Sequence, residues 1–96
     1  MPHRVILSPG AKADIRSAIR WYVNQQLGLP LRFGVEYKTT LRRVAQNPYQ
    51  FPLVNHVVRR ALLNRFPYAI YFTVSARAVF VTAVLHQRRL NPWCTP

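Results

Sequence analysis

Two apolar segments in the C-terminal half of the chain constrain the fold most. They span residues 68–74 and 78–85, and nearly every position in them is aliphatic or aromatic. Neighbouring side chains of a strand point to opposite faces, so segments of this kind must be buried on both sides. We therefore predict two central strands, with helices packed on at least one face of the sheet.

The first half of the chain predicts one strand followed by two helices. The apolar run 5–7 is followed by a Ser-Pro pair, which is typical of the cap and first turn of a helix. From residue 11 to about residue 27, apolar residues recur at helical spacing, and Gly28 is expected to end this helix. A second amphipathic helix is predicted over residues 30–47. So short a link between the two predicts a helical hairpin.

A third strand completes the predicted sheet. Residues 57–63 form a β-compatible run, and residues 48–55, with two prolines and no helical period, are expected to be a loop with Tyr49 and Phe51 turned inward. The predicted fold class is α+β, with two layers in the order β-α-α-β-β-β. A small, mainly antiparallel sheet packs on the helical hairpin, and residues 1–96 form a single domain.

The charge of the chain limits the functions that it can have. Fourteen Lys and Arg residues face only two acidic residues, Asp14 and Glu36, which gives a formal net charge of +12. This imbalance predicts a strongly anionic partner. Twelve of the cations are Arg, the residue suited to planar, bidentate contact with phosphate or carboxylate. Because the two carboxylates lie in different segments, enzymes that use paired carboxylates, such as glycosidases and aspartic proteases, are excluded.

The sequence offers no pattern typical of a metal or cofactor site. Its one cysteine, Cys94, and its three histidines have none of the usual ligand spacings, so we expect no metal and no cofactor. No signal-peptide core and no apolar run of membrane-spanning length are found, which predicts a cytoplasmic protein that does not contact a membrane.

Candidate functional groups gather where the last predicted strand meets solvent. His86 stands at that end and is followed by Arg88 and Arg89. Simple alternation along the strand places His86 on the same face as Phe80, Thr82 and Val84. A structural interpretation remains open, in which His86 is partly buried and bonded to a backbone carbonyl.

Five arginines beside His86 could form a phosphate-binding patch. They are Arg59, Arg60, Arg65, Arg88 and Arg89. If the strands form a meander, the arginines at 59, 60 and 65 would lie close to those at 88 and 89. The other interpretation is that Arg59 and Arg60 point to opposite faces and solvate an edge strand, which also protects that edge from pairing.

A second basic surface is predicted on the outer faces of the two helices. Its members are Lys12, Arg16, Arg20, Lys38 and Arg42. It is either a solvated face or a surface that attracts an acidic partner. Trp21 and Trp93 are the aromatic residues best placed for an exposed contact, although both could instead cover the core.

Several short motifs, taken together and in order, resemble the RelE/ParE superfamily of toxins from bacterial type II toxin–antitoxin modules. The matching pieces are Ser8-Pro9-Gly10-Ala11 with Asp14-Ile15, Trp21-Tyr22, Arg32-Phe33, Asn47-Pro48, Val58-Arg59-Arg60, the run Arg65-Phe66-Pro67-Tyr68 with Ile70-Tyr71-Phe72, and His86 with Arg88-Arg89, Pro92 and Trp93. The resemblance covers nearly the whole chain and implies a small antiparallel sheet with a helical hairpin.

The resemblance implies a partner as well as a fold. In such modules, which are linked to plasmid stabilisation and growth inhibition, an acidic antitoxin wraps the toxin, and the complex binds its promoter DNA through the antitoxin. For this chain we expect the antitoxin-binding residues to be Arg16, Arg20, Trp21, Tyr37 and Arg42.

Two mechanisms follow from the resemblance. A ParE-like toxin binds DNA gyrase and performs no chemistry, whereas a RelE-like toxin is an endoribonuclease that cuts mRNA on the ribosome. As a nuclease, the chain would use His86 for proton transfer and Arg59, Arg60 and Arg65 to stabilise charge on the phosphate.

The sequence favours the gyrase hypothesis. Active ribonuclease relatives usually carry several Lys, Glu or a C-terminal Tyr for this work, but this chain has no Lys after Lys38 and no Tyr after Tyr71. A third hypothesis, a free-standing nucleic-acid-binding module, depends on charge alone.

Overall fold

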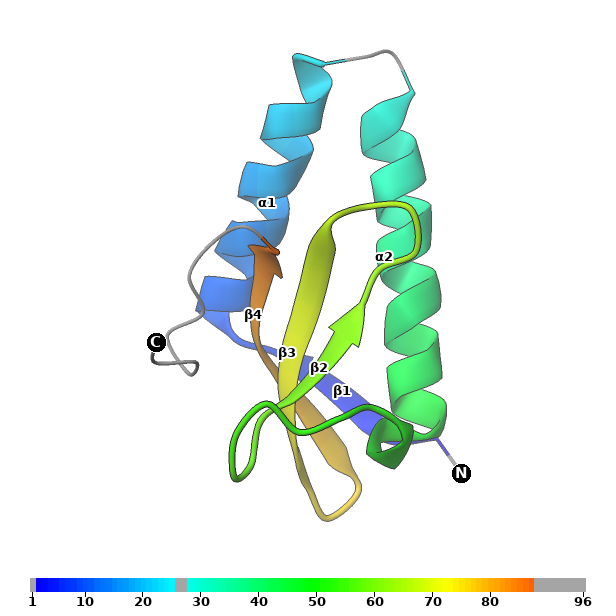
Figure 1. The fold of residues 1–96 in the computed structure, drawn as a ribbon, viewed down its shortest axis with the longest axis vertical. Coiled ribbons are helices and arrows are strands. Elements are labelled where there is room, and N and C mark those ends of the chain that lie inside the picture. Colours follow the sequence, from blue (N-terminus) through cyan, green and yellow to red (C-terminus); the bar gives the residue numbers. More distant parts are fainter. Residues whose placement is uncertain (1, 26–27, 88–96) are drawn as a thin grey trace.

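The computed structural model describes residues 2–25 and 28–87, which fold as two helices packed on a four-stranded sheet (Figure 1). The elements in chain order are β1 (Arg4–Leu7), α1 (Pro9–Val23), α2 (Leu29–Gln46), the 3₁₀ turn η1 (Pro48–Gln50), β2 (Arg59–Leu62), β3 (Tyr68–Ser75) and β4 (Ala78–His86). The predicted α+β class and the order β-α-α-β-β-β are confirmed.

Within the described chain, the strands lie in the order β1-β4-β3-β2. β3 pairs antiparallel with both β2 and β4, whereas β1 runs parallel to β4. β3 and β4 are therefore the central strands, as their two-sided apolar sequences predict. The connected ends of α1 and α2 extend beyond the sheet (Figure 1), so residues there have a helix neighbour but no strand beneath them.

The start of α1 follows the predicted cap. The Ser8 hydroxyl oxygen accepts a hydrogen bond from the Ala11 N–H at 3.0 Å, and Pro9 occupies the first turn. The prediction for the other end of this helix was wrong, because α1 stops at Val23 and Gly28 instead precedes α2. Gly28 has a φ of 89°, a conformation that glycine adopts at little cost, and it starts the second helix of the hairpin.

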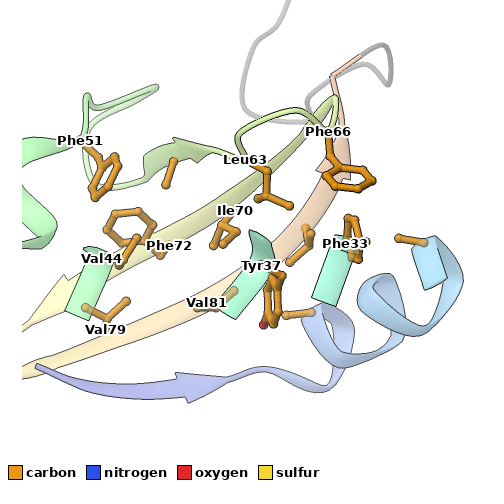
Figure 2. Packing of buried hydrophobic residues seen from close by; sticks show 14 of the residues in the cluster. Phe33, Tyr37, Val44, Phe51, Leu63, Phe66, Ile70, Phe72, Val79 and Val81 are labelled. Carbon is orange, nitrogen blue, oxygen red and sulfur yellow. The ribbon is translucent and has the colours of Figure 1, made fainter. Parts of the chain in front are cut away.

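The main core lies between the sheet and the hairpin (Figure 2). Its largest fully buried side chains come from α2 and from the two central strands, with Phe33, Val44, Ile70, Phe72 and Val81 among them. The i, i+4 and i+7 spacing of the inner stripe of α2 produces this packing. Phe51 is buried in the same core, as predicted, but Tyr49 is 59% exposed, so the expectation that both turn inward was half right.

A second, smaller cluster covers the opposite face of the sheet. Its buried members are Val58, Ala69, Tyr71, Ala83 and Leu85, and the loop residue Val54 packs against them. β3 and β4 are thus buried on both faces, which explains why their sequences show no polar alternation.

Candidate functional site

A β-bulge in β4 decides where the predicted site residue His86 points. Tyr71 pairs with Ala83 but Phe72 pairs with Val81, so Thr82 is an extra residue on β4. The Thr82 hydroxyl donates to the Tyr71 carbonyl at 3.1 Å. One inserted residue reverses the side-chain alternation beyond it.

The bulge corrects the predicted face of His86. Val79 and Val81 belong to the core beneath the helices, so Phe80 between them points to the other face. Beyond the bulge, Val84 also belongs to that core, and His86 follows it toward the helices. His86 therefore shares a face with Val84 but not with Phe80, because simple alternation does not hold across Thr82.

His86 lines a groove between α1 and the end of β4, which we call the α1–β4 groove. It has a volume of about 420 Å³ and is lined by Asp14, Ser17, Ala18, Trp21, Tyr68, Val84 and His86. Trp21 is 55% exposed at the rim, which favours the accessible of the two interpretations left open for it over a cover for the core. The ring of Tyr68 lies edge-on to His86, with 5.2 Å between the ring centroids.

The carboxylate in this groove is already engaged by the backbone. β1 pairs with β4 only as far as Val81, and α1 covers the exposed edge of β4 beyond that point. The Asp14 carboxylate accepts a hydrogen bond from the Val84 N–H at 3.0 Å, and the Ser8 hydroxyl donates to the Thr82 carbonyl at 3.2 Å. Asp14 thus completes the sheet edge, a role that the sequence reasoning missed.

Four aromatic side chains beneath this groove form what we call the aromatic cluster. They are Tyr22, Phe33, Phe66 and Tyr68, and their neighbouring ring centroids lie 5.2–6.1 Å apart. Three of these five pairs are edge-to-face, an arrangement that is favourable beyond the area that it buries. Burial, and secondarily the neighbouring Tyr68, raises the pKa of Tyr22, so its hydroxyl stays neutral.

A second groove, the α2 groove, lies on the other side of the aromatic cluster. It has a volume of about 490 Å³ and is lined by Leu29, Leu31, Arg32, Val35, Glu36, Arg65 and Phe66. Leu31 is 77% exposed and Val35 is 59% exposed. Both lie outside the predicted inner stripe of α2, and their i, i+4 spacing was the signal that could have revealed this groove.

Arg65 holds an unusual backbone conformation beside the α2 groove. Its φ is 70°, in the left-handed region, within the tight connection between β2 and β3. For a residue with a Cβ this conformation costs about 1 kcal/mol relative to glycine. The structure thus maintains a strained arginine where glycine would be easier to accommodate.

The described members of the predicted arginine patch do not converge. Arg59 lies on the helix side, where its guanidinium donates to the Phe51 carbonyl at 2.6 Å and stacks over the Tyr49 ring. Arg60 lies on the opposite face, in register with Tyr71. Arg65 follows the far end of β2. The interpretation that Arg59 and Arg60 point to opposite faces is confirmed, whereas Arg88 and Arg89 lie outside the described residues.

The predicted antitoxin-binding residues also divide into two groups. Arg16, Arg20 and Trp21 are exposed on α1, and Arg42 is exposed on α2. Tyr37 is only 7% exposed and belongs to the core, so it does not contribute to that surface (Figure 2). Among residues 2–25 and 28–87, no three His, Cys, Asp or Glu side chains gather as metal ligands. No helix in the same ranges is long and apolar enough to cross a membrane.

Comparison with known proteins identifies the family. A family model described as the ParE toxin of the type II toxin–antitoxin system parDE matches residues 5–91. The chain belongs to the ParE toxin family. The fold of this ParE-family chain is similar to a solved structure titled as the chromosomal ParDE TA system from P. aeruginosa, with a TM-score of 0.73 and 19% identity. The match covers 85% of this chain and 92% of that chain. No curated protein matches the sequence.

Membership of the ParE family confirms the resemblance seen in the sequence motifs. It also places the two grooves and the aromatic cluster within the matched residues 5–91. Both grooves of this ParE-family toxin combine apolar and charged side chains: the α1–β4 groove has one carboxylate, Asp14, whereas the α2 groove has Arg32, Glu36 and Arg65 beside four apolar residues.

Proposed function

We propose that this ParE-family toxin stops growth by binding DNA gyrase in the cytoplasm, without chemistry of its own, and that a cognate acidic antitoxin neutralises it. The match to the ParE toxin family over residues 5–91 carries this proposal. The net charge of +12 supports an acidic inhibitor, because a polyanionic segment would relieve the self-repulsion of the toxin as it binds.

The geometry of the charged groups supports binding over catalysis. A ribonuclease must bring a base, an acid and phosphate-binding cations to within hydrogen-bonding distance of one substrate. In the described chain, Arg59 is held by the Phe51 carbonyl, and Arg65 lines the α2 groove, whereas His86 lines the α1–β4 groove. Arg60 lies on the opposite face of the sheet from His86. These candidates therefore do not share one site.

Controlled expression of the toxin without its antitoxin tests the target. We expect DNA synthesis to stop before protein synthesis, and we expect purified gyrase to lose supercoiling activity or to accumulate cleaved DNA when the purified toxin is added. Cutting of ribosome-bound mRNA within minutes of induction, with gyrase activity intact, would refute the proposal.

His86→Ala separates the two mechanisms further. Under the gyrase proposal, His86 is not a catalytic group, so neither the original chain nor the variant produces mRNA fragments. Under the nuclease hypothesis, the original chain cuts mRNA and the variant does not. RNA sequencing of both strains after induction distinguishes these results.

A further inference from the structure

Tyr49 is a large aromatic side chain that the fold leaves at the surface. It lies in the turn η1, where it is 59% exposed, although Pro48 before it and Phe51 after it are both buried. Phe51 belongs to the main core, and Tyr49 does not. The ring of Tyr49 therefore gains little from burial, and its flat surface is accessible to a ligand.

Contacts from two other segments hold this ring in place. The Arg59 guanidinium lies over it, 5.1 Å from the ring centroid, and also donates to the Phe51 carbonyl at 2.6 Å. The His3 ring lies edge-on, with 6.2 Å between the centroids, and the His3 N–H donates to the Ala45 carbonyl at the end of α2. We call His3, Tyr49 and Arg59 the Tyr49 platform. A ring held in this way loses little conformational entropy when a ligand stacks on it.

Further arginines surround the platform. Arg43 is exposed in the last turn of α2, with its guanidinium over the Phe51 ring at 5.4 Å from the centroid. Arg4 and Arg77 are also exposed, and the Arg4 N–H donates to the Arg77 carbonyl at 2.8 Å. Arg77 follows Ala76, which has a left-handed φ of 53°, in the β3–β4 turn. This turn, η1 and the start of β1 lie at the same end of the molecule (Figure 1).

Both carboxylates of the chain lie away from this end. Asp14 accepts a hydrogen bond from the Val84 N–H, near the end of β4 that is farther from Arg77. Glu36 lines the α2 groove together with Arg65, which follows the far end of β2. A ligand at the Tyr49 platform therefore meets cations without a neighbouring carboxylate, which favours a ligand with several negative charges.

A flat ring among arginines suits a strand of nucleotides. A nucleobase can stack on an aromatic ring while the phosphates on either side of it pair with guanidinium groups. An acidic peptide would satisfy the arginines but would give the ring no flat partner. In a duplex the bases are stacked on one another, so their faces are not accessible to Tyr49.

We propose that the Tyr49 platform binds single-stranded nucleic acid, with one base stacked on Tyr49 and the adjoining phosphates bound by Arg43 and Arg59. An arginine has five N–H donors, so Arg59 keeps donors for a phosphate beside its bond to Phe51. This binding activity goes beyond the proposed function and does not depend on it, because it requires neither gyrase nor an antitoxin.

A direct test measures the affinity of the whole chain for a fluorescent thymidine oligomer of about 12 nucleotides. Fluorescence anisotropy gives its Kd. Tyr49→Ala should weaken binding about 5-fold or more, whereas Tyr49→Phe keeps the ring and should stay within about 2-fold of the original chain. Trp21→Ala is the matched control, because it removes another exposed aromatic ring from a different surface. Equal weakening by Tyr49→Ala and Trp21→Ala would overturn the proposal.

Two further probes separate stacking from charge, since a chain of net charge +12 attracts any polyanion. One is an abasic oligomer with the same number of phosphates, and the other is an oligoglutamate with the same number of charges. Tyr49→Ala should leave the affinity for both unchanged. If this variant bound oligoglutamate as much more weakly as it bound the thymidine oligomer, the site would recognise acidic peptides and the proposal would be overturned.

The salt dependence of binding tests the phosphate contacts. Arg43→Gln should reduce the slope of log K against log salt by about 0.7, the value for one phosphate contact with a single strand. Lys12→Gln makes the same change in charge on the first turn of α1 and should leave the slope unchanged. Thermal unfolding of each variant checks that it is folded. Equal slopes for the Arg43→Gln and Lys12→Gln variants would refute the phosphate contact at the platform.

Discussion

Removing the Asp14 carboxylate should destabilise the sheet edge by a predictable amount. Val84 is 2% exposed, so water cannot replace the hydrogen bond that its N–H donates to Asp14. Leaving a buried N–H unpaired costs about 1–3 kcal/mol, and a hydrogen bond to a charged acceptor lies in the upper part of that range. Alanine is the better helix former by about 0.5 kcal/mol, which offsets part of the loss. We expect Asp14→Ala to lower the free energy of unfolding by about 2 kcal/mol.

For a domain of this size, the corresponding fall in Tm is about 8–16 °C, which circular dichroism can measure. Glu36→Ala is the matched control, because it also removes one of the two negative charges from a helix, and it should change the stability by less than about 0.5 kcal/mol. Asp14→Asn keeps an oxygen acceptor and should lose only about 1 kcal/mol. If the Asp14→Ala and Glu36→Ala variants were equally stable, the role of Asp14 as the hydrogen-bond acceptor for the Val84 N–H would be refuted.

Three other changes have defined outcomes. Burial raises the pKa of Tyr37 to about 12, so between about pH 10 and pH 12 this side chain ionises in the unfolded chain before it does in the folded one, and the free energy of unfolding should fall as the pH rises through this range. Tyr37→Phe should reduce this fall, and a variant with the same pH profile as the original chain would contradict the prediction. Ala76→Gly should stabilise the chain by about 0.5–1 kcal/mol in thermal unfolding, and a lower Tm would count against strain at this turn. Phe66→Ala should cost about 3–5 kcal/mol in denaturant unfolding because Phe66 packs against Tyr22 and Phe33, whereas a cost below about 1 kcal/mol would show that the cluster collapses.

The parts of the fold that depend on short sequence patterns could be predicted. The Ser8 cap, the inner stripe of α2 and the two-sided burial of β3 and β4 all arise from neighbouring residues or from a simple period. The end of α1 was harder to predict, because helical spacing continues past Val23 while the hairpin turn begins at Asn24. Helix ends depend on the next element as well as on local propensity.

The candidate site depended on contacts that no local pattern contains. The direction of His86 is set by an extra residue at Thr82, and the role of Asp14 depends on a backbone N–H that is 70 residues away along the chain. The α2 groove forms only when Arg65, from the β2–β3 connection, comes to lie beside the first turns of α2. Charge and composition led to the expectation of an acidic partner, but they could not indicate which cations surround an apolar surface.

The bulge at Thr82 also affects how relatives of this chain should be compared. Before the bulge, the odd-numbered residues of β4, such as Val79 and Val81, face the helices. After the bulge, the even-numbered residues, such as Val84, face them instead. Losing one residue here would exchange the two surfaces at the end of the strand and turn His86 away from the α1–β4 groove. Within this family, a single-residue gap in β4 can therefore alter the displayed surface more than several substitutions, and alignments should be judged by strand parity as well as by residue identity.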